Sequence, residues 1–88
     1  MSNSVIQSVN SDFKVELYKN KSKFISKSKY TFYVYKKMFI QWIKIRTLNS
    51  NDLEFISLEI YNLMKEKFNF SDSQIQKFKN EVMEKLNG

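Results

Sequence analysis

The feature that most constrains the fold is a single change in hydrophobic periodicity near residue 50. Before it, Phe13, Val15 and Leu17 alternate with polar neighbours, which is typical of a half-buried strand. After it, apolar residues recur at helical spacing. Strands followed by helices predict an α+β fold: a small antiparallel sheet of three or more strands within residues 13–47, and two C-terminal helices packed on one face.

Residues 30–46 are rich in aromatic and β-branched side chains and are too long for one ordinary strand. A turn at Lys37-Met38 folds this stretch into a hairpin with one mostly aliphatic face and one aromatic and basic face. This register pairs Tyr30 with Ile45, Phe32 with Ile43, Val34 with Gln41, Tyr33 with Trp42, Tyr35 with Ile40 and Thr31 with Lys44.

The two helices are expected near residues 52–68 and 72–86. Asn51 with Glu54 resembles a capping box, and Ser71 with Gln74 forms a clear one. Asn69 is suited to the left-handed residue that ends a helix. The side chains expected in the core are Phe32, Ile43, Ile56, Ile60, Phe78 and Val82.

The chain has 88 residues, which is the length of one domain. Residues 1–11 are polar and without period, so we expect a flexible N-terminal arm followed by a single α+β domain over residues 12–88. There is no Cys, no signal-peptide pattern at the start and no apolar run of about 20 residues. These features predict a cytoplasmic protein, in the host-cell interior if the source is viral, without a membrane partner.

Catalysis is disfavoured by the residues that the chain lacks. It has no His and no Cys, which are the usual general base and the usual strong nucleophile. Arg46 is its one arginine and Gly88 its one glycine, so neither an arginine clamp nor a glycine-rich phosphate loop can form. We therefore expect no enzymatic activity, no cofactor and no metal site.

The charge distribution points to an anionic partner. Residues 1–50 carry nine Lys and one Arg against two acids, a net charge of +8, whereas residues 51–88 carry five Lys against seven acids, a net charge of −2. Positive charge gathered on the strands attracts polyanions and speeds encounter with them. The predicted partner is nucleic acid, or a protein that handles nucleic acid.

Cations and rings occur together in the strand half of the chain. A Lys-rich segment over residues 19–29 supplies loop cations, and the hairpin adds rings beside further cations. Bases stack on rings while Lys meets phosphate, so this combination is typical of nucleic-acid binding. The candidate binding residues are Lys21, Lys23, Lys27, Lys29, Tyr33, Tyr35, Lys37, Trp42, Lys44 and Arg46.

Two other interpretations use the same face of the sheet. In one, the chain is an inhibitor or adaptor that binds and blocks a host protein. Small phage-encoded inhibitors of host defence, anti-CRISPR proteins among them, are similar in size to this chain, and that is a likeness of class which assigns no residue. In the other, a homo-oligomer buries the aromatic face, since a large exposed apolar patch is unusual on a monomer.

Overall fold

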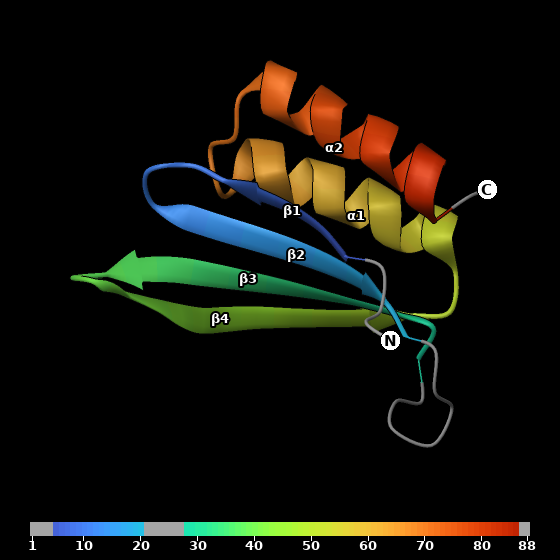
Figure 1. Cartoon of the computed structure of the whole chain (residues 1–88), viewed down its shortest axis with the longest axis horizontal. Coiled ribbons are helices and arrows are strands. Elements are labelled where there is room, and N and C mark those ends of the chain that lie inside the picture. Colours follow the sequence, from blue (N-terminus) through green and yellow to red (C-terminus); the bar gives the residue numbers. More distant parts are fainter. Residues whose placement is uncertain (1–4, 21–27, 87–88) are drawn as a thin grey trace.

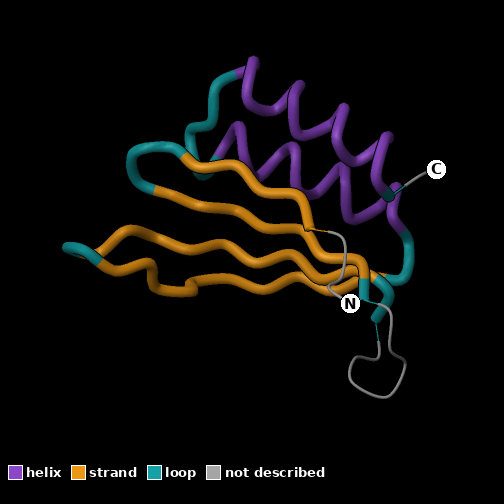
Figure 2. Tube along the Cα trace, in the orientation of Figure 1, coloured by secondary structure: helices purple, strands orange, loops and turns teal. Residues whose placement is uncertain are grey.

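The computed structural model describes residues 5–20 and 28–86. Its elements are β1 (Val5–Val9), β2 (Phe13–Lys19), β3 (Tyr30–Met38), β4 (Gln41–Ser50), α1 (Leu53–Glu66) and α2 (Asp72–Lys85). The four strands form one antiparallel sheet in sequence order, and both helices lie over the same face of it (Figures 1 and 2). The predicted α+β arrangement is confirmed.

The first strand lies in the stretch where the sequence predicted a flexible arm. Val5–Val9 pairs with β2 along its length, and Ile6 is only 1% exposed. The prediction is therefore wrong for these residues. A five-residue edge strand holding a single core side chain has too few positions to show a period, and its stability comes from pairing with β2.

The hairpin turn lies two residues later than predicted. Phe39 and Ile40 form the turn instead of Lys37-Met38, and Lys37 pairs with Trp42. The predicted pairs are thus wrong in register. Because moving a turn by two residues shifts the pairing by an even number, most side chains keep their predicted face. The aromatic and basic side chains still share one face of the sheet.

Ile43 is the exception among the predicted core residues. It is 43% exposed and pairs with Lys36, near the end of the hairpin that extends past the helices (Figure 1). The later turn removes it from the helix-covered part of the sheet. The other predicted core residues are buried: Phe32, Ile56, Ile60, Phe78 and Val82.

The helix ends follow from local side chains. Asp52 caps α1 by accepting hydrogen bonds from the backbone N–H groups of Glu54 and Phe55, one residue later than the predicted Asn51 cap. Asn69 has a φ of 58° between the helices, as predicted. Ser71 and Gln74 form the predicted capping box at the start of α2.

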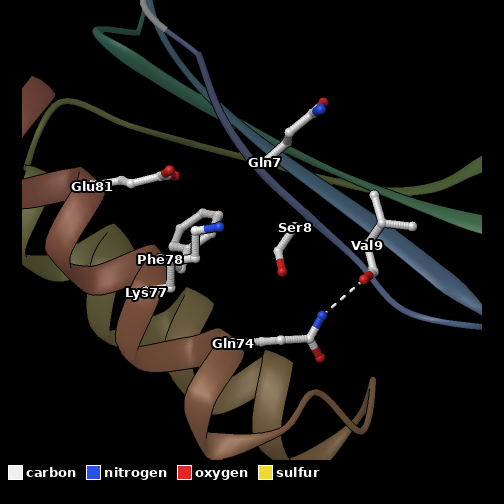
Figure 3. A pocket seen from close by; sticks show the side chains of 7 residues that line it. All are labelled: Gln7, Ser8, Val9, Gln74, Lys77, Phe78 and Glu81. Carbon is white, nitrogen blue, oxygen red and sulfur yellow. Dashed lines mark hydrogen bonds between the residues drawn. The ribbon is translucent and has the colours of Figure 1, made fainter.

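Long-range hydrogen bonds hold the helices on their side of the sheet. Asn10, in the β1–β2 turn, donates through Nδ2 to the carbonyl of Phe68 at 2.9 Å. Gln74 donates through Nε2 to the carbonyl of Val9 at 2.8 Å, a contact that Figure 3 shows reaching from α2 to β1. The two acceptors are backbone carbonyls at the end of β1 and just after α1, so the bonds join the helices to the edge of the sheet. The opposite face of the sheet carries no described element.

Candidate nucleic-acid interface

The sheet face away from the helices is built by the residues that alternate with the core. In β3, Phe32 and Val34 are buried under the helices, so Tyr33 and Tyr35 point the other way. The strand pairing brings Glu16 and Thr47 beside Tyr33, and Lys14 and Lys44 beside Tyr35. We call the following set the open face: Lys14, Tyr18, Tyr33, Tyr35, Lys37, Trp42 and Lys44.

Three of its rings form a row across β2 and β3. The ring centroids of Tyr18 and Tyr33 are 5.6 Å apart in an edge-to-face arrangement, and those of Tyr33 and Tyr35 are 6.3 Å apart. These separations lie within the range of favourable aromatic pairs. The rings are held partly exposed, which leaves ring surface for an incoming planar group.

Lysine ammonium groups lie over these rings. The Nζ of Lys44 is 3.8 Å from the ring centroid of Tyr33, and the Nζ of Lys14 is 4.7 Å from that of Tyr35. Trp42 has Lys14 at 5.5 Å and Lys37 at 6.0 Å. The open face therefore alternates rings with cations at distances where both can contact one bound molecule.

One carboxylate lies among these groups. Glu16 accepts a hydrogen bond from the Tyr18 hydroxyl at 3.0 Å and forms an ion pair with Lys14 at 3.8 Å. Partial burial, and after it the negative charge of Glu16, raises the pKa of Tyr35 to about 12. Partial burial, and after it the hydrogen bond to Glu16, raise the pKa of Tyr18. Both phenols thus stay neutral at physiological pH and add no negative charge to the face.

The raised pKa of Tyr35 predicts a measurable difference in alkaline titration. An unfolded tyrosine ionises near pH 10, so between about pH 10 and 12 the unfolded chain loses the proton that folded Tyr35 retains. The stabilisation linked to this group is complete below pH 10 and is lost as the pH rises towards 12. Ultraviolet titration of phenolate should show a late step in the wild type that is missing in Tyr35→Phe.

Tyr30→Phe is the matched control for that titration, because Tyr30 lies on the helix side of the same strand. It should remove one tyrosine from the total absorbance change and leave the late step near pH 12. An unchanged late step in Tyr35→Phe would contradict the assignment.

The structure gathers half of the predicted site residues on the open face: Tyr33, Tyr35, Lys37, Trp42 and Lys44. Arg46 is not among them. The register shifts by one residue between the pairs Val34–Arg46 and Tyr35–Lys44, which leaves Ile45 unpaired and puts Arg46 on the helix side with Val34. A one-residue bulge moves the residues beyond it to the opposite face of the sheet from the one that simple alternation predicts.

Lys29, one of the predicted loop cations, is separated from this cluster. Lys29 lies at the far end of β3, where its backbone N–H donates to Asn51 Oδ1 at 2.9 Å. Eight strand positions separate it from Lys37, about 26 Å at about 3.3 Å per residue. Lys21, Lys23 and Lys27 lie outside the described residues.

Two members of the open face were absent from the predicted site. Lys14 and Tyr18 belong to β2, whose alternation was visible in the sequence. The polar side of that alternation, Lys14-Glu16-Tyr18, was the available signal, because it had to lie on the face opposite Val15 and Leu17. What the sequence did not give was the order of strands that puts β2 beside β3.

A groove of about 270 Å³ lies elsewhere, between β1 and α2 (Figure 3). Lys77 and Glu81 are the charged residues that line it, with Phe78 between them in sequence and Gln74 three residues before Lys77. Within residues 5–20 and 28–86 there is no cluster of three or more acidic, His or Cys side chains placed to hold a metal ion. The open face is thus the richer arrangement of interacting groups.

The chain matches no protein-family model, no curated protein and no solved structure. Neither α1 nor α2 is long and apolar enough to cross a membrane, within the part of the chain that the structure describes.

Proposed function

We propose that this protein is a non-enzymatic nucleic-acid-binding protein whose open face holds a single strand. The supporting observation is the row of rings with lysine ammonium groups 3.8–6.0 Å from the ring centroids. Bases of a single strand can stack on Tyr33, Tyr35 and Trp42 while the lysines contact the phosphates between them.

A single strand suits this surface better than an uninterrupted duplex. The bases of a duplex are stacked on one another, so a flat sheet meets only their edges and the phosphates. Unpaired bases offer their flat surfaces, and recognition of single strands commonly uses aromatic side chains on an open sheet. The rings of the open face can contribute only in the second case.

The lysines that lie over the rings do not prevent stacking. An exposed cation–π contact is worth about 0.5–1 kcal/mol, whereas stacking of one base on an aromatic side chain is worth about 1–3 kcal/mol. A base that displaces Lys44 from Tyr33 therefore gains more than the contact it breaks. The displaced ammonium remains beside the ring, where it can meet the adjoining phosphate.

The test is binding of a labelled single-stranded oligonucleotide, as DNA and as RNA, by fluorescence anisotropy at several salt concentrations. Each lysine–phosphate contact to a single strand should contribute about −0.7 to the slope of log K against log[salt]. Lys44→Gln should reduce the magnitude of that slope by about 0.7 and weaken binding of all sequences similarly.

Lys77→Gln is the control, because Lys77 is an exposed cation on α2, away from the open face. It removes the same charge and should leave the slope unchanged. No binding of DNA or RNA by the wild type at low salt would refute the proposal. The open face would then be a protein surface, either of an inhibitor with its target or of a homo-oligomer, and a complex that survives nuclease treatment would identify it.

A further inference from the structure

The end of the β3–β4 hairpin carries a concentrated group of exposed apolar side chains. Phe39 is 97% exposed and Ile40 92%, and Met38 beside them is 49% exposed. We call Met38–Ile40 the hairpin tip. It projects beyond the ends of both helices (Figure 1), so no described part of the chain covers it. Three consecutive exposed apolar residues at a turn are unusual on a soluble surface.

The backbone conformation at the tip is unfavourable for the residue that occupies it. Phe39 has a φ of 57°, a conformation disfavoured for any residue with a Cβ, and Ile40 does not share the positive φ. A hairpin turn of this kind favours Gly at its first central position. Phe39 thus occupies a position where Gly would fit with less strain, and its ring contributes nothing to the core. Its exposure and its backbone conformation therefore favour a role outside the folded monomer.

The charges around the tip indicate the chemistry of what covers it. Residues 30–50 contain three Lys and one Arg, and no acidic residue. Lys36 and Lys37 immediately precede the tip, and the backbone N–H of Lys37 donates to the carbonyl of Asp12. The hairpin thus has apolar side chains at its turn and lysines in the strand beside it. These features complement a ligand that is negatively charged on its outside and has flat apolar groups inside. A nucleic-acid duplex has that construction.

A second copy of this chain fits the tip less well. Two hairpins brought together would each contribute three Lys and one Arg over residues 30–50, with no acidic residue in that stretch to pair with them. The bulge at Ile45 also twists the free edge of β4 away from regular pairing.

We propose that the hairpin tip stacks on the terminal base pair of a duplex, and that the preferred ligand is a junction between duplex and single strand. This inference rests on the proposed function of the open face. A wedge inserted within a continuous duplex must first unstack two base pairs. At a junction the terminal pair is already exposed, so stacking of Phe39 on it requires no unstacking.

The spacing of rings behind the tip agrees with this arrangement. Trp42 lies two strand positions from Ile40, about 7 Å at about 3.3 Å per residue. That is about two base-pair steps of a duplex, at about 3.4 Å each along the helix axis. An unpaired strand leaving the duplex end along the hairpin therefore meets Trp42 first, and then Tyr35 and Tyr33 on the open face.

The experiment compares three probes at one salt concentration: a single strand, a blunt duplex, and the same duplex with that single strand as a tail. The wild type should bind the tailed duplex on the order of tenfold more tightly than the single strand, because one further stacking contact forms. Phe39→Gly should abolish this preference and leave single-strand affinity unchanged. Its melting temperature should equal or exceed that of the wild type, since Gly relieves the strain at this φ.

Two further variants make the result specific. Phe39→Trp keeps a stacking ring and should retain the preference, whereas Phe55→Ala removes an exposed ring from α1 and should change no affinity. A 2-aminopurine at the duplex end should report stacking of the tip by quenching with the wild type and not with Phe39→Gly.

The outcomes separate the two proposals. The junction inference is wrong if the wild type binds single strands without preferring the tailed duplex, or if Phe39→Gly keeps that preference. Either result is still compatible with single-strand binding by the open face. Absence of binding to all three probes overturns both. In that case the exposed tip belongs to a contact with a protein.

Discussion

Phe78→Ala should lower the free energy of unfolding by about 3–5 kcal/mol, the largest single effect expected in this molecule. Phe78 is 1% exposed in the core between α2 and the sheet, and its ring lies edge-to-face with that of Tyr61 at 6.4 Å. Truncation removes a large buried ring and leaves a cavity that a domain of this size has few side chains to fill. Urea denaturation followed by circular dichroism measures the loss.

Met83→Ala is the matched control on the same helix. Met83 is 65% exposed, so its truncation should change the unfolding free energy by no more than about 0.5 kcal/mol. A loss below about 1 kcal/mol for Phe78→Ala would mean that α2 does not pack on the sheet through this face. A protein with a total stability near 5 kcal/mol would keep only about 0–2 kcal/mol of it after the same substitution.

The helical half of the fold could be predicted because its signals are local. The capping box of Ser71 and Gln74 and the left-handed Asn69 each involve neighbours in sequence. The buried residues of both helices recur at a spacing that only one helix face can satisfy. Such signals depend little on what the helix packs against, and both helix boundaries were correct to within two residues.

The hairpin turn could not be predicted in the same way. Its central residues, Phe39 and Ile40, have none of the chemistry that marks a turn, and the sequence offers no Gly or Asn near them. A turn placed two residues earlier leaves the aliphatic and the aromatic side chains on the same two faces of the hairpin, so the hydrophobic pattern could not distinguish the two positions. Where local preference and the observed structure disagree, the residue is often retained for an interaction outside the fold. That is the basis for the proposal that the tip binds a partner.

The composition of the candidate site was partly visible in the sequence for a related reason. An even shift in register leaves every residue on its face, so Tyr33, Tyr35 and Trp42 were grouped correctly from an incorrect pairing. Arg46 was predicted on the wrong face because a one-residue bulge reverses the alternation of side chains along β4. No residue type in the sequence predicts where such a bulge occurs. Lys14 and Tyr18 were missed because strand order is a property of the whole sheet.

Trp42→Ala should weaken binding of a single strand by about 1–3 kcal/mol, roughly fivefold to 150-fold, through loss of one base-stacking contact. Stacking releases no condensed counterions, so the slope of log K against log[salt] should stay close to that of the wild type. Lys44→Gln should do the opposite: the slope should become smaller, and the loss of affinity should be largest at low salt and shrink as the salt concentration rises. Anisotropy titrations of both variants over the same salt series distinguish the two contributions.

Trp42 is partly buried and has the ammonium groups of Lys14 and Lys37 near its ring, so its removal must also be checked for an effect on folding. Trp42→Phe keeps a smaller ring in the same strand and should recover much of the affinity, because stacking tolerates the exchange of one aromatic for another. A variant with both Trp42→Ala and Lys44→Gln completes a double-mutant cycle. If one nucleotide contacts both side chains, the combined loss will differ from the sum of the single losses by more than about 0.5 kcal/mol. Equal affinity of Trp42→Ala and the wild type, with both folded, would remove base stacking from the open face and leave only its charge.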